Sequence, residues 1–588
     1  MKKLFRFRFM NYLCISFFLL AVSGVVKSQE TNQLIIKYKG KISGHQFAQK
    51  LNGIQQVASH YGVALSSQRT MSLGAEVVRL DKKLPDEVVE NLAKAIAKVD
   101  SSIEYAEADT LMQPAFVPND ARYNEQWHYF ESTGGIRAPS AWNKSTGSGV
   151  NIAVIDTGYR PHADLTANIL PGYDFIHDPN VSLDGDGRDS DAIDPGDGCS
   201  GRADSWHGTH VAGTIAAKTN NSIGVAGVAF DAKIVPARTL GCGGGYISDI
   251  ADAITWTSGG NVPGVPTNAN VAKVLNLSLS GSGACGETYQ KAINGATDRG
   301  SVVVVSAGNQ NTDASTRRPA NCDGVITVAA TDRAGNRAYY SNFGNTVEIA
   351  APGGETSGNK SNQNGVLSTL NTGVTSPGSD TYAFYEGTSM AAPHIAGVAA
   401  LMLSVQPKAT PEQISIVLQE TARIAPGTCN GCGAGIVDAA AAVNAMDDLL
   451  VGLYRYWNSA IGDHTLTIDR NDNLYAFLGY SLEKIEAYVS SKPRSGFVPL
   501  NRYWNATLGD SFLTITRNDP GFAAFGYEFV TEEGYVSSNS RSGFAPLNRY
   551  WNPDLGDHFL TILRDDYALG IFGYTFERIE GYAQSEPY

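Results

Sequence analysis

The stretch VNIAVIDTG, residues 150–158, joins a run of apolar residues to an aspartate, and three similar runs follow it. They are KIVPARTL at 233–240, KVLNLSLS at 273–280 and SVVVVSAGN at 301–309. Strands that are apolar on both sides are typical of a parallel sheet whose two faces are covered by helices. Because helical segments alternate with these runs, we predict an α/β domain with a mostly parallel sheet over residues 119–446.

The segments on either side of this region have other patterns. Residues 30–115 follow a β-α-β-β-α-like order without cysteine, which predicts a small α+β domain, and the proline-containing linker 113–119 is of the exposed type that proteases cut. Residues 452–588 contain three units with a period of 47 residues, each marked by Arg-Tyr-Trp-Asn, at 455, 502 and 549. Three short aromatic units are too few for a propeller and predict one all-β, trefoil-like module.

The first 28 residues have the pattern of an export signal. A positive region comes first, with Lys2, Lys3, Arg6 and Arg8. The apolar run from Tyr12 to Val22 is too short for a comfortable membrane span, so residues 1–28 are predicted to be a signal peptide and the protein to be secreted, as in bacteria. A retained signal anchor is the alternative. The net charge of −13 argues against a nucleic-acid partner.

Six cysteines follow the predicted signal peptide. An even number in a secreted chain predicts disulfides, although six cysteines allow 15 pairings. The CxxC at 429–432 has no second CxxC or His pair nearby, so a local disulfide is favoured over a zinc or redox motif. We predict pairing between neighbours in the sequence: Cys199–Cys242, Cys285–Cys322 and Cys429–Cys432.

Three motifs carry reactive side chains. Asp156-Thr-Gly ends the first apolar strand, His207-Gly-Thr-His-Val-Ala-Gly leads into a helix, and Gly387-Thr-Ser389-Met-Ala-Ala-Pro opens another helix. Each motif alone is weak evidence, but the order Asp, His, Ser in these contexts is highly specific. A serine hydroxyl needs a base within hydrogen-bond reach, and a histidine oriented by an aspartate supplies it. The motifs predict acyl transfer by the triad Asp156, His207 and Ser389.

With these motifs in this order, residues 119–446 resemble the subtilisin family of serine proteases. The segments NNSIGVAGVA at 220–229 and SAGN at 306–309 also resemble that family. The resemblance implies a secreted serine endopeptidase of broad specificity, which hydrolyses proteins and peptides through an acyl-enzyme on Ser389. It also implies that the Asn309 side chain joins the backbone N–H of Ser389 in holding the oxyanion. We expect a monomer.

The same resemblance implies where substrate binds. A peptide is expected to bind as an added strand, with Ser278-Leu279-Ser280-Gly281 forming one wall of the primary pocket and Ala307-Gly308 the other. This mode reads backbone more than side chains and so favours broad specificity. Arg317-Arg318-Pro319 falls where the family often has small or aromatic residues near the pocket base, which leaves the preferred substrate side chain open.

Calcium is the cofactor that the sequence implies. By resemblance, one site consists of Asp164, Asn221 and the carbonyls of Thr219, Ile223 and Val225. The insertion 184–197 is a second candidate, because carboxylate oxygens at short spacing suit Ca²⁺, and a solvated acidic loop is its alternative. Its six aspartates are Asp184, Asp186, Asp189, Asp191, Asp194 and Asp197.

Other histidines near the motifs are not expected to be ligands. His210 lies three residues after His207, but no third ligand with suitable spacing completes a zinc site. His162 and His394 are interpreted as polar residues of a loop or helix.

The flanking domains have expected partners. The resemblance implies that residues 30–115 are an inhibitory pro-domain that the enzyme removes by cutting near 112–118. The module at 452–588 is expected to bind a surface polymer, such as carbohydrate or extracellular matrix. Its repeated Trp fits an exposed sugar-binding face and a buried core equally well. In the second case, binding would fall to polar positions, namely Asp463, His464, His558 and Arg502.

Two rival functions stay open at this point. One is a processing protease selective for dibasic sites, with the acidic insertion supplying negative subsites. The other is an adhesin that works through its repeats and carries an inactive protease scaffold. The intact triad, Asn309 and the pro-segment favour the active protease over both.

Overall fold

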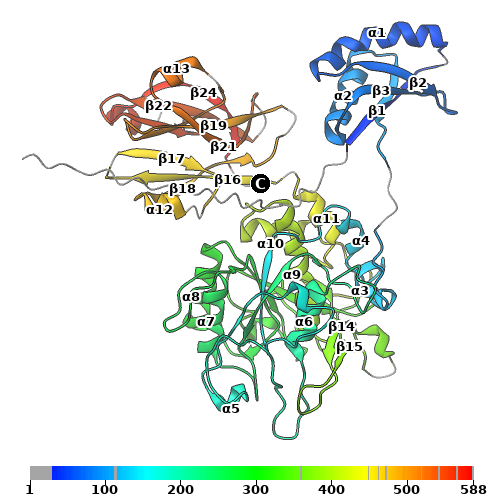
Figure 1. Ribbon diagram of the computed structural model, residues 1–588, viewed down its shortest axis with the longest axis vertical. Coiled ribbons are helices and arrows are strands. Elements are labelled where there is room, and N and C mark those ends of the chain that lie inside the picture. Colours follow the sequence, from blue (N-terminus) through cyan, green and yellow to red (C-terminus); the bar gives the residue numbers. More distant parts are fainter. Residues whose placement is uncertain are drawn as a thin grey trace, which may run out of the picture. The chain divides into compact units, whose positions relative to one another are not determined.

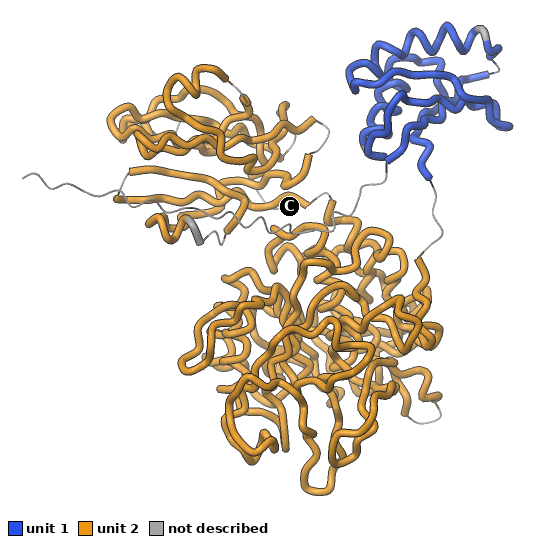
Figure 2. The backbone as a smooth tube through the Cα atoms, in the orientation of Figure 1, with its two compact units in different colours: residues 1–112 blue, residues 113–588 orange. Residues whose placement is uncertain are grey.

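The computed structural model describes residues 30–585 except 41, 112–115, 358–359, 448, 461, 471–472, 494–495, 518, 541–542 and 564–566. The predicted signal peptide, 1–28, lies outside the described residues. The chain divides into two compact units, residues 1–112 and 113–588 (Figure 2).

The first unit is a four-stranded antiparallel sheet of order β2-β3-β1-β4 with two helices (Figure 1). Its elements are β1 (Glu30–Tyr38), α1 (Gly44–His60), β2 (Leu65–Thr70), β3 (Glu76–Pro85), α2 (Asp86–Val99) and β4 (Ile103–Ala108). Leu34 and Ile36 of β1 meet Leu92 and Ile96 of α2 in one buried core, because alternate strand residues and every third or fourth helix residue share a face. The predicted α+β class is confirmed, and β2 is a strand that the prediction did not name.

The second unit contains a seven-stranded parallel sheet, which confirms the predicted mostly parallel sheet (Figure 1). Its order is β13-β12-β10-β8-β5-β7-β6. The strands are β5 (Asn151–Asp156), β6 (Tyr173–Asp174), β7 (Lys233–Arg238), β8 (Val274–Leu277), β10 (Val302–Ser306), β12 (Val325–Thr331) and β13 (Ile349–Pro352).

Helices cover both faces of this sheet. Ile152 and Val154 of β5 lie in one core with α6 and α9, whereas Ala153 and Ile155 lie in a second core with α7 and α8. A strand buried on both faces must be apolar at every position, which explains the continuous runs in the sequence. The main helices are α6 (His207–Ala216), α7 (Ile247–Thr257), α8 (Gly286–Asp298), α9 (Thr388–Val405), α10 (Pro411–Glu420) and α11 (Ala439–Ala445).

Two short ribbons and several single turns complete this part. The strand β9 (Gly281–Ser282) pairs with β11 (Arg317–Arg318), and β14 (Val366–Asn371) pairs with β15 (Asp380–Tyr385). The shorter helices are α3 (Trp127–Phe130), α4 (Ala138–Trp142) and α5 (Pro179–Ser182). Helix α9 is apolar and long enough to cross a membrane, but 83% of it is buried inside the protein, so it is a core helix.

Residues 450–584 form the three-fold, antiparallel module. Each repeat has a long strand, a short strand, a five-residue helix and a long return strand. The first repeat is β16 (Leu450–Asn458), β17 (Asp463–Thr467), α12 (Asn473–Phe477) and β18 (Ser481–Ser490). The second is β19 (Phe497–Asn505), β20 (Asp510–Thr514), α13 (Pro520–Ala524) and β21 (Glu528–Ser537). The third is β22 (Phe544–Asn552), β23 (Asp557–Thr561), α14 (Tyr567–Ile571) and β24 (Thr575–Gln584).

The three repeats close on one another. The return strands β18, β21 and β24 pair mutually, so the units form a ring. Equivalent leucines from each repeat fill a common core, among them Leu453, Leu500 and Leu547. The all-β class is confirmed, although the prediction missed the short helix in each repeat.

Candidate active site

The three motif residues stand where elements begin or end. Asp156 is the last residue of β5, His207 the first residue of α6, and Ser389 the second residue of α9. Ser389 Oγ donates to the carbonyl of Ser278, which directly follows β8, at 3.1 Å. Since β8 pairs with β5, this contact places the serine at the carboxyl edge of the sheet, where open α/β sheets bind ligands.

Asp156 and His207 form a direct pair. Asp156 Oδ1 accepts a hydrogen bond from His207 Nδ1 at 2.7 Å and another from the backbone N–H of Thr157 at 2.8 Å. Burial alone would lower the pKa of His207, but the charge of Asp156, with smaller contributions from Asp197 and Asp194, holds it above its usual value. The pair therefore favours the cationic imidazole that forms when a base takes up a proton.

Thr157 links the strand of Asp156 to the helix of His207. Its Oγ1 accepts the backbone N–H of Gly208 at 3.0 Å and donates to Asp194 Oδ2 at 2.7 Å. Asp194 is buried, and burial raises its pKa to about 7. Because Thr157 and Gly208 are neighbours of the two paired residues, this contact fixes the distance between β5 and α6.

His207 Nε2 faces no protein partner among the described residues, since its only hydrogen bond uses Nδ1. Ser389 Oγ is instead directed to Ser278. Catalytic hydrogen bonds often tighten only when substrate binds, so a rotation of the Ser389 side chain toward Nε2 is the step needed before reaction.

Two N–H donors converge beside Ser389. Asn309 Oδ1 accepts from Thr388 N at 2.9 Å and from Thr388 Oγ1 at 2.7 Å, which leaves its Nδ2 pointing elsewhere. A Cβ on Gly387 would lie 3.4 Å from that Nδ2 and 3.6 Å from Ser389 N. Because residue 387 has no side chain, the space between Asn309 Nδ2 and Ser389 N stays open. An oxyanion hole needs such a space between two N–H donors. Thr388 and Gly387 were not singled out from the sequence, although both belong to its third motif.

The other histidines are engaged inside the protein. His210 Nε2 bonds the carbonyl of Ala383 at 3.0 Å, and its ring stacks on Tyr385. His394 bonds His128 at 2.8 Å and the carbonyl of Met390 at 2.8 Å. His162 Nδ1 accepts from Asp164 N at 3.1 Å. These contacts agree with the interpretation of all three as structural residues.

The two expected substrate walls lie next to each other. Ser306 Oγ donates to the carbonyl of Leu279 at 3.3 Å. A Cβ on Gly308 would lie 2.9 Å from Ser280 Oγ, so the Ser280 side chain is directed toward the second wall. Gly281 begins β9, and its pairing with β11 makes the first wall part of a two-stranded ribbon.

The first candidate calcium site is a compact set of oxygens. Asp164 accepts from Asn221 Nδ2 at 2.7 Å and from Val225 N at 2.8 Å. The carbonyls of Thr219, Ile223 and Val225 accept no hydrogen bond from the described residues.

Asp120, which the sequence reasoning missed, lies against this loop. It is 5% exposed, its Oδ2 accepts from Asn220 N at 2.8 Å, and its Oδ1 has no protein partner. Its charge contributes to the raised pKa of Asp164, for which burial is the main cause. A buried carboxylate oxygen without a donor, beside a second carboxylate and free carbonyls, fits a calcium ion.

The aspartates of the acidic insertion make several contacts inside the protein. Asp184 and Asp174 pair with the buried Arg238, Asp194 holds Thr157, and Asp197 accepts from Ser205 N at 2.6 Å. Asp189 and Asp191 accept from backbone N–H groups two residues ahead. Among the described residues, the acidic oxygens of 184–197 form no cluster of three. Local donors and one buried arginine engage most of these carboxylates, and calcium binding at this insertion, including Asp186, stays a prediction.

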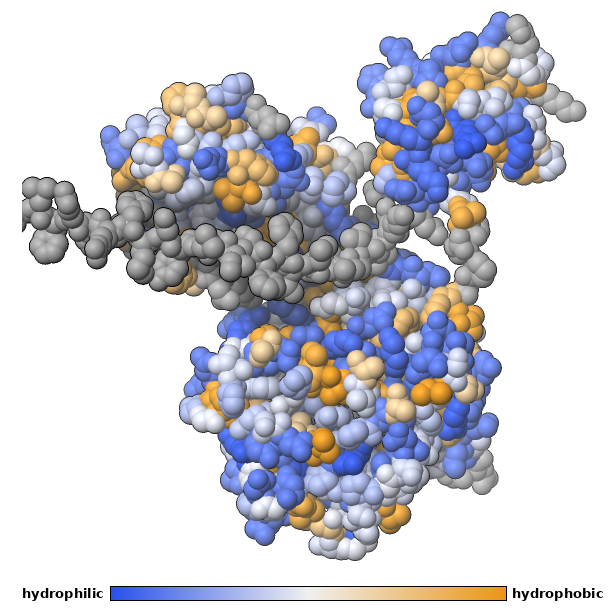
Figure 3. Space-filling view, in the orientation of Figure 1, coloured by the Kyte–Doolittle hydropathy of each residue, from blue (hydrophilic) through white to orange (hydrophobic). Residues whose placement is uncertain are grey.

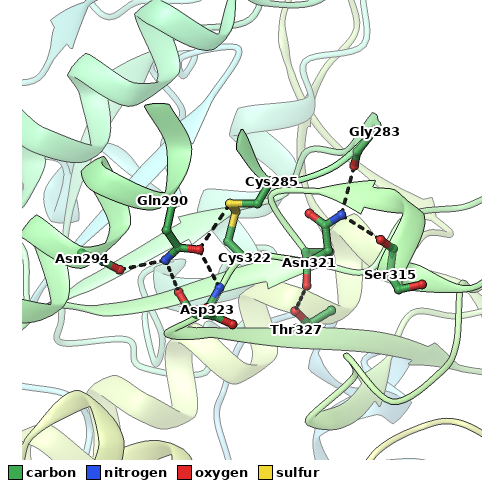
Figure 4. The surroundings of a disulfide bond; sticks show 10 residues. Gly283, Cys285, Gln290, Asn294, Ser315, Asn321, Cys322, Asp323 and Thr327 are labelled. Carbon is green, nitrogen blue, oxygen red and sulfur yellow. Dashed lines mark hydrogen bonds between the residues drawn. A yellow bond between two sulfur atoms is a disulfide. The ribbon is translucent and has the colours of Figure 1, made fainter. Parts of the chain in front are cut away.

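The structure contains the three predicted disulfides, Cys199–Cys242, Cys285–Cys322 and Cys429–Cys432. Figure 4 shows the second, which joins the start of α8 to the segment that carries Asn321. Asn321 Nδ2 donates to the carbonyls of Gly283 at 3.0 Å and Ser315 at 2.8 Å. The residues on either side of β11 are thereby tied to the segment that follows β9.

In the C-terminal module, the polar positions expected to bind ligand are used internally. His464 Nδ1 bonds Asp557 at 2.9 Å and His558 Nδ1 bonds Asp510 at 2.6 Å, each across a repeat boundary. Asp463, Asp510 and Asp557 are buried together where the repeats meet. Arg502 pairs with the buried Glu533 at 2.7 Å. These contacts inside the module hold its repeats together, and ligand binding at these positions stays a prediction.

The tryptophans of the repeats are not core residues. Trp457, Trp504 and Trp551 are half-buried, whereas the preceding tyrosines are about 5% exposed (Tyr456, Tyr503 and Tyr550). Of the two roles that the sequence left open for the tryptophans, the structure favours the surface one.

Comparison with known proteins assigns both large regions. Residues 147–443 match the subtilase family, and residues 452–584 match a domain of unknown function. The chain is 52% identical over 394 residues to the "Extracellular protease" of Xanthomonas campestris pv. campestris, covering 65% of this chain and 66% of that protein. It is 41% identical over 436 residues to the "Extracellular basic protease" of Dichelobacter nodosus, covering 70% of each. A solved protease structure from Pseudoalteromonas arctica is similar at 56% identity with a TM-score of 0.56, covering 56% of this chain and all of that one.

Proposed function

The chain belongs to the subtilase family and is a serine-type endopeptidase, and from this premise we propose that Asp156, His207 and Ser389 are its catalytic triad. The observation that carries the proposal is the 2.7 Å contact of His207 Nδ1 with Asp156 Oδ1, beside a serine at a helix start. Relatives named extracellular proteases support secretion, and protein is the substrate.

The proposed reaction follows from the geometry. Neutral His207 accepts at Nε2 the proton of Ser389 Oγ while Oγ bonds to the scissile carbonyl carbon. The oxygen that becomes anionic receives hydrogen bonds from Ser389 N and Asn309 Nδ2. Asp156 stabilises the imidazolium, which then gives its proton to the leaving amine. A water molecule repeats the sequence on the acyl-enzyme and releases Ser389.

The test is Ser389→Ala, produced in a host without other proteases. We expect no casein hydrolysis and an uncleaved pro-segment, since both need the same nucleophile. Ser404→Ala is the matched control, because Ser404 lies near the far end of the same helix and bonds the carbonyl of Ser148. Casein hydrolysis by pure Ser389→Ala protein would refute the triad.

Residues 30–115 are proposed to be the inhibitory pro-domain. Their support is the family membership and the independent α+β core of this unit. N-terminal sequencing of secreted wild-type protein should find a new start between residues 112 and 119. A start near residue 30 on fully active protein would contradict this role.

Calcium is proposed at Asp164, Asn221, Asp120 and the carbonyls of Thr219, Ile223 and Val225. Bound Ca²⁺ would supply a positive charge that neutralises two buried carboxylates and joins the segment at 120 to the loop at 219–225. It takes no part in the acyl transfer. A ligand that binds only the native state raises stability with concentration.

The calcium proposal is tested on Ser389→Ala protein, so that self-digestion does not interfere. We expect EDTA to lower the melting temperature and added Ca²⁺ to restore it. Asp120→Asn should reduce this calcium-dependent gain, whereas Asp186→Asn in the acidic insertion should leave it unchanged. A melting temperature that does not respond to EDTA would remove the site.

The C-terminal module is proposed to bind a surface polymer, carbohydrate or extracellular matrix, through the half-buried Trp457, Trp504 and Trp551. Three weak equivalent sites can act together by avidity. Full-length Ser389→Ala protein should be retained on insoluble polysaccharide, cell walls or collagen, and a triple Trp→Ala variant should not be. Leu508→Ser with Leu555→Ser is the control, because these leucines are 53% and 52% exposed elsewhere in the module. Retention on none of the materials would contradict the proposal.

A further inference from the structure

The ribbon β9–β11 brings two arginines next to the expected substrate wall. Its register pairs Arg318 with Gly281 and Arg317 with Ser282. Gly281 is the last residue of the wall Ser278–Gly281, so the arginines stand directly beside residues expected to bind peptide.

The two arginines occupy opposite sides of the ribbon, because successive side chains of a strand alternate. Arg317 shares the side of its partner, and its NH1 donates to Ser282 Oγ at 2.7 Å. Ser280, two residues before Ser282, is directed toward Gly308 of the second wall. Arg317 therefore lies on the side of the ribbon where the two walls meet.

Arg318 extends along the other side. A Cβ on Gly281 would lie 3.7 Å from Arg318 Cγ, and one on Gly283 would lie 3.5 Å from Arg318 Cζ. The side chain thus covers the backbone of two glycines. It adds a second positive charge to the ribbon without reaching the side that faces Gly308.

Neither arginine has an acidic partner. Arg122 pairs with Glu125 at 2.7 Å and Arg188 with Asp249 at 2.6 Å, but no ion pair within the described residues includes Arg317 or Arg318. Arg317 is half-buried, and its Nε is buried without a hydrogen-bond partner. A guanidinium that is partly desolvated and unpaired is costly, and a carboxylate relieves that cost through charge and paired N–H donors.

The arginines are also held in place. The Cys285–Cys322 disulfide and the two hydrogen bonds of Asn321 to Gly283 and Ser315 join the residues on either side of β11 to those that follow β9 (Figure 4). Gly283 N also donates to the carbonyl of Thr316 at 3.0 Å. A rigid ribbon loses little freedom when it binds a charged group, which favours specificity.

We propose that Arg317 makes this protease prefer substrates with an acidic side chain, Asp or Glu, at the residue before the cleaved bond. The inference rests on the proposed function, since it assumes that peptide binds along Ser278–Gly281. It refines the broad specificity expected from the resemblance and opposes a dibasic preference, because the charge at this wall is positive.

The test uses mature wild-type enzyme and four peptides that differ only at the residue before the cleaved bond, which is Glu, Gln, Lys or Phe. We expect kcat/KM for Glu to exceed that for its isostere Gln by roughly ten-fold, with Lys the poorest. The Glu/Gln ratio should fall as NaCl rises, because salt screens the charge. In Arg317→Gln the ratio should fall to about one, and Arg317→Lys should keep part of it.

Lys291→Gln is the matched control. It removes one positive charge from α8, where the Lys291 side chain is 78% exposed, and should leave the Glu/Gln ratio unchanged. Glu cleaved no better than Gln by wild type, or a ratio retained in Arg317→Gln, would overturn the inference. If Arg317→Gln does not fold, the wild-type ratio and its salt dependence decide. Failure to cleave casein and all four peptides would instead count against the proposed function.

Discussion

The chain uses the same pair of residues, histidine and aspartate, in two regions with opposite results. His207 Nδ1 contacts Asp156 at 2.7 Å in the protease, and His464 and His558 contact Asp557 and Asp510 at 2.9 and 2.6 Å in the C-terminal module. The contact distances are alike. What differs is the surroundings of the other ring nitrogen.

In the protease, Nε2 of His207 faces no described protein partner, and the side chain is 21% exposed beside Ser389. In the module, the side chains of His464 and His558 are 13% and 12% exposed, and each Nε2 lies 3.8 Å from a glutamate. The aspartates there also accept a tyrosine hydroxyl, from Tyr574 or Tyr527. A His–Asp pair becomes a catalyst only when its second nitrogen is left for a substrate proton.

The largest expected effect is on catalytic activity, when the aspartate of each His–Asp pair is replaced by asparagine. Asp156→Asn should lower kcat by about 10⁴-fold with little change in melting temperature, because the amide favours the wrong histidine tautomer. Asp557→Asn should leave peptide hydrolysis unchanged. Kinetics on one peptide substrate check both. Equal loss of activity in the two variants would show that the pairs are not functionally distinct.

The next effect concerns stability of the module. Asp557→Asn leaves His464 and Tyr574 without their buried charged partner, so we expect a loss of about 3 kcal/mol in the free energy of unfolding. Calorimetry of full-length Ser389→Ala protein measures it, because a module that unfolds independently gives its own transition. Asp554→Asn, in the turn before β23, is the control. An unchanged module transition in Asp557→Asn would contradict the locking role.

A smaller effect distinguishes the repeats from one another. Ser511 stands where the other repeats have His464 and His558, so Asp463 lacks a histidine and its pKa is raised, mainly by burial, to about 8. Native protein then keeps a proton that the unfolded chain releases near pH 4, so module stability should fall as pH rises from about 4 to about 8.

Two variants sharpen that prediction. Asp463→Asn, which resembles the protonated acid, should flatten the pH profile of the module transition. Ser511→His should build the missing pair and raise the transition at pH 8. Melting curves at pH 5 and pH 8 decide, and a parallel profile in wild type and Asp463→Asn would contradict the proton assigned to Asp463.

The smallest effect is a shift in the pH dependence of catalysis. Activity needs neutral His207, whose pKa is held above its usual value, so kcat/KM should rise with pH through that pKa. Asp197→Asn removes a minor contributor and should move the midpoint down by a few tenths of a pH unit. A pH–rate profile measures it, with Asp252→Asn, in α7, as the control. A midpoint that moves upward would contradict the sign.

The proposed catalytic residues could be found in the sequence because the motifs that carry them are local. Asp156, His207 and Ser389 each sit in a short motif at a strand end or helix start, and the parallel sheet brings such ends together whatever the loops do. The disulfides were also predictable, since their partners are neighbours in the sequence.

The roles of single acidic residues could not be predicted. Asp184 is expected from the sequence to bind calcium. In the structure it forms an ion pair with Arg238, which is buried in β7 and also pairs with Asp174. Asp120 enters the proposed calcium site only because the segment at 120 packs against the loop at 219–225. Which carboxylate meets which cation depends on long-range packing, and the spacing of aspartates in one loop does not contain it.

The repeats show a second limit. Tyr456 and Trp457 are adjacent and both aromatic, so the sequence cannot say which of them points inward. Alternation along a strand assigns them to opposite faces, and a shift of one residue would exchange them. The closure of the three repeats around one core determines which of the two side chains points inward.

The ring of repeats also affects what the enzyme can digest. An unpaired strand edge offers backbone N–H and C=O groups to any partner that binds by adding a strand, and a protease that holds peptides this way needs such an edge. In the module, β18, β21 and β24 pair with one another, and β17, β20 and β23 lie against one another around the buried aspartates. Where the described strands pair in this way, the folded module offers its own enzyme no free strand edge, which hinders cutting there.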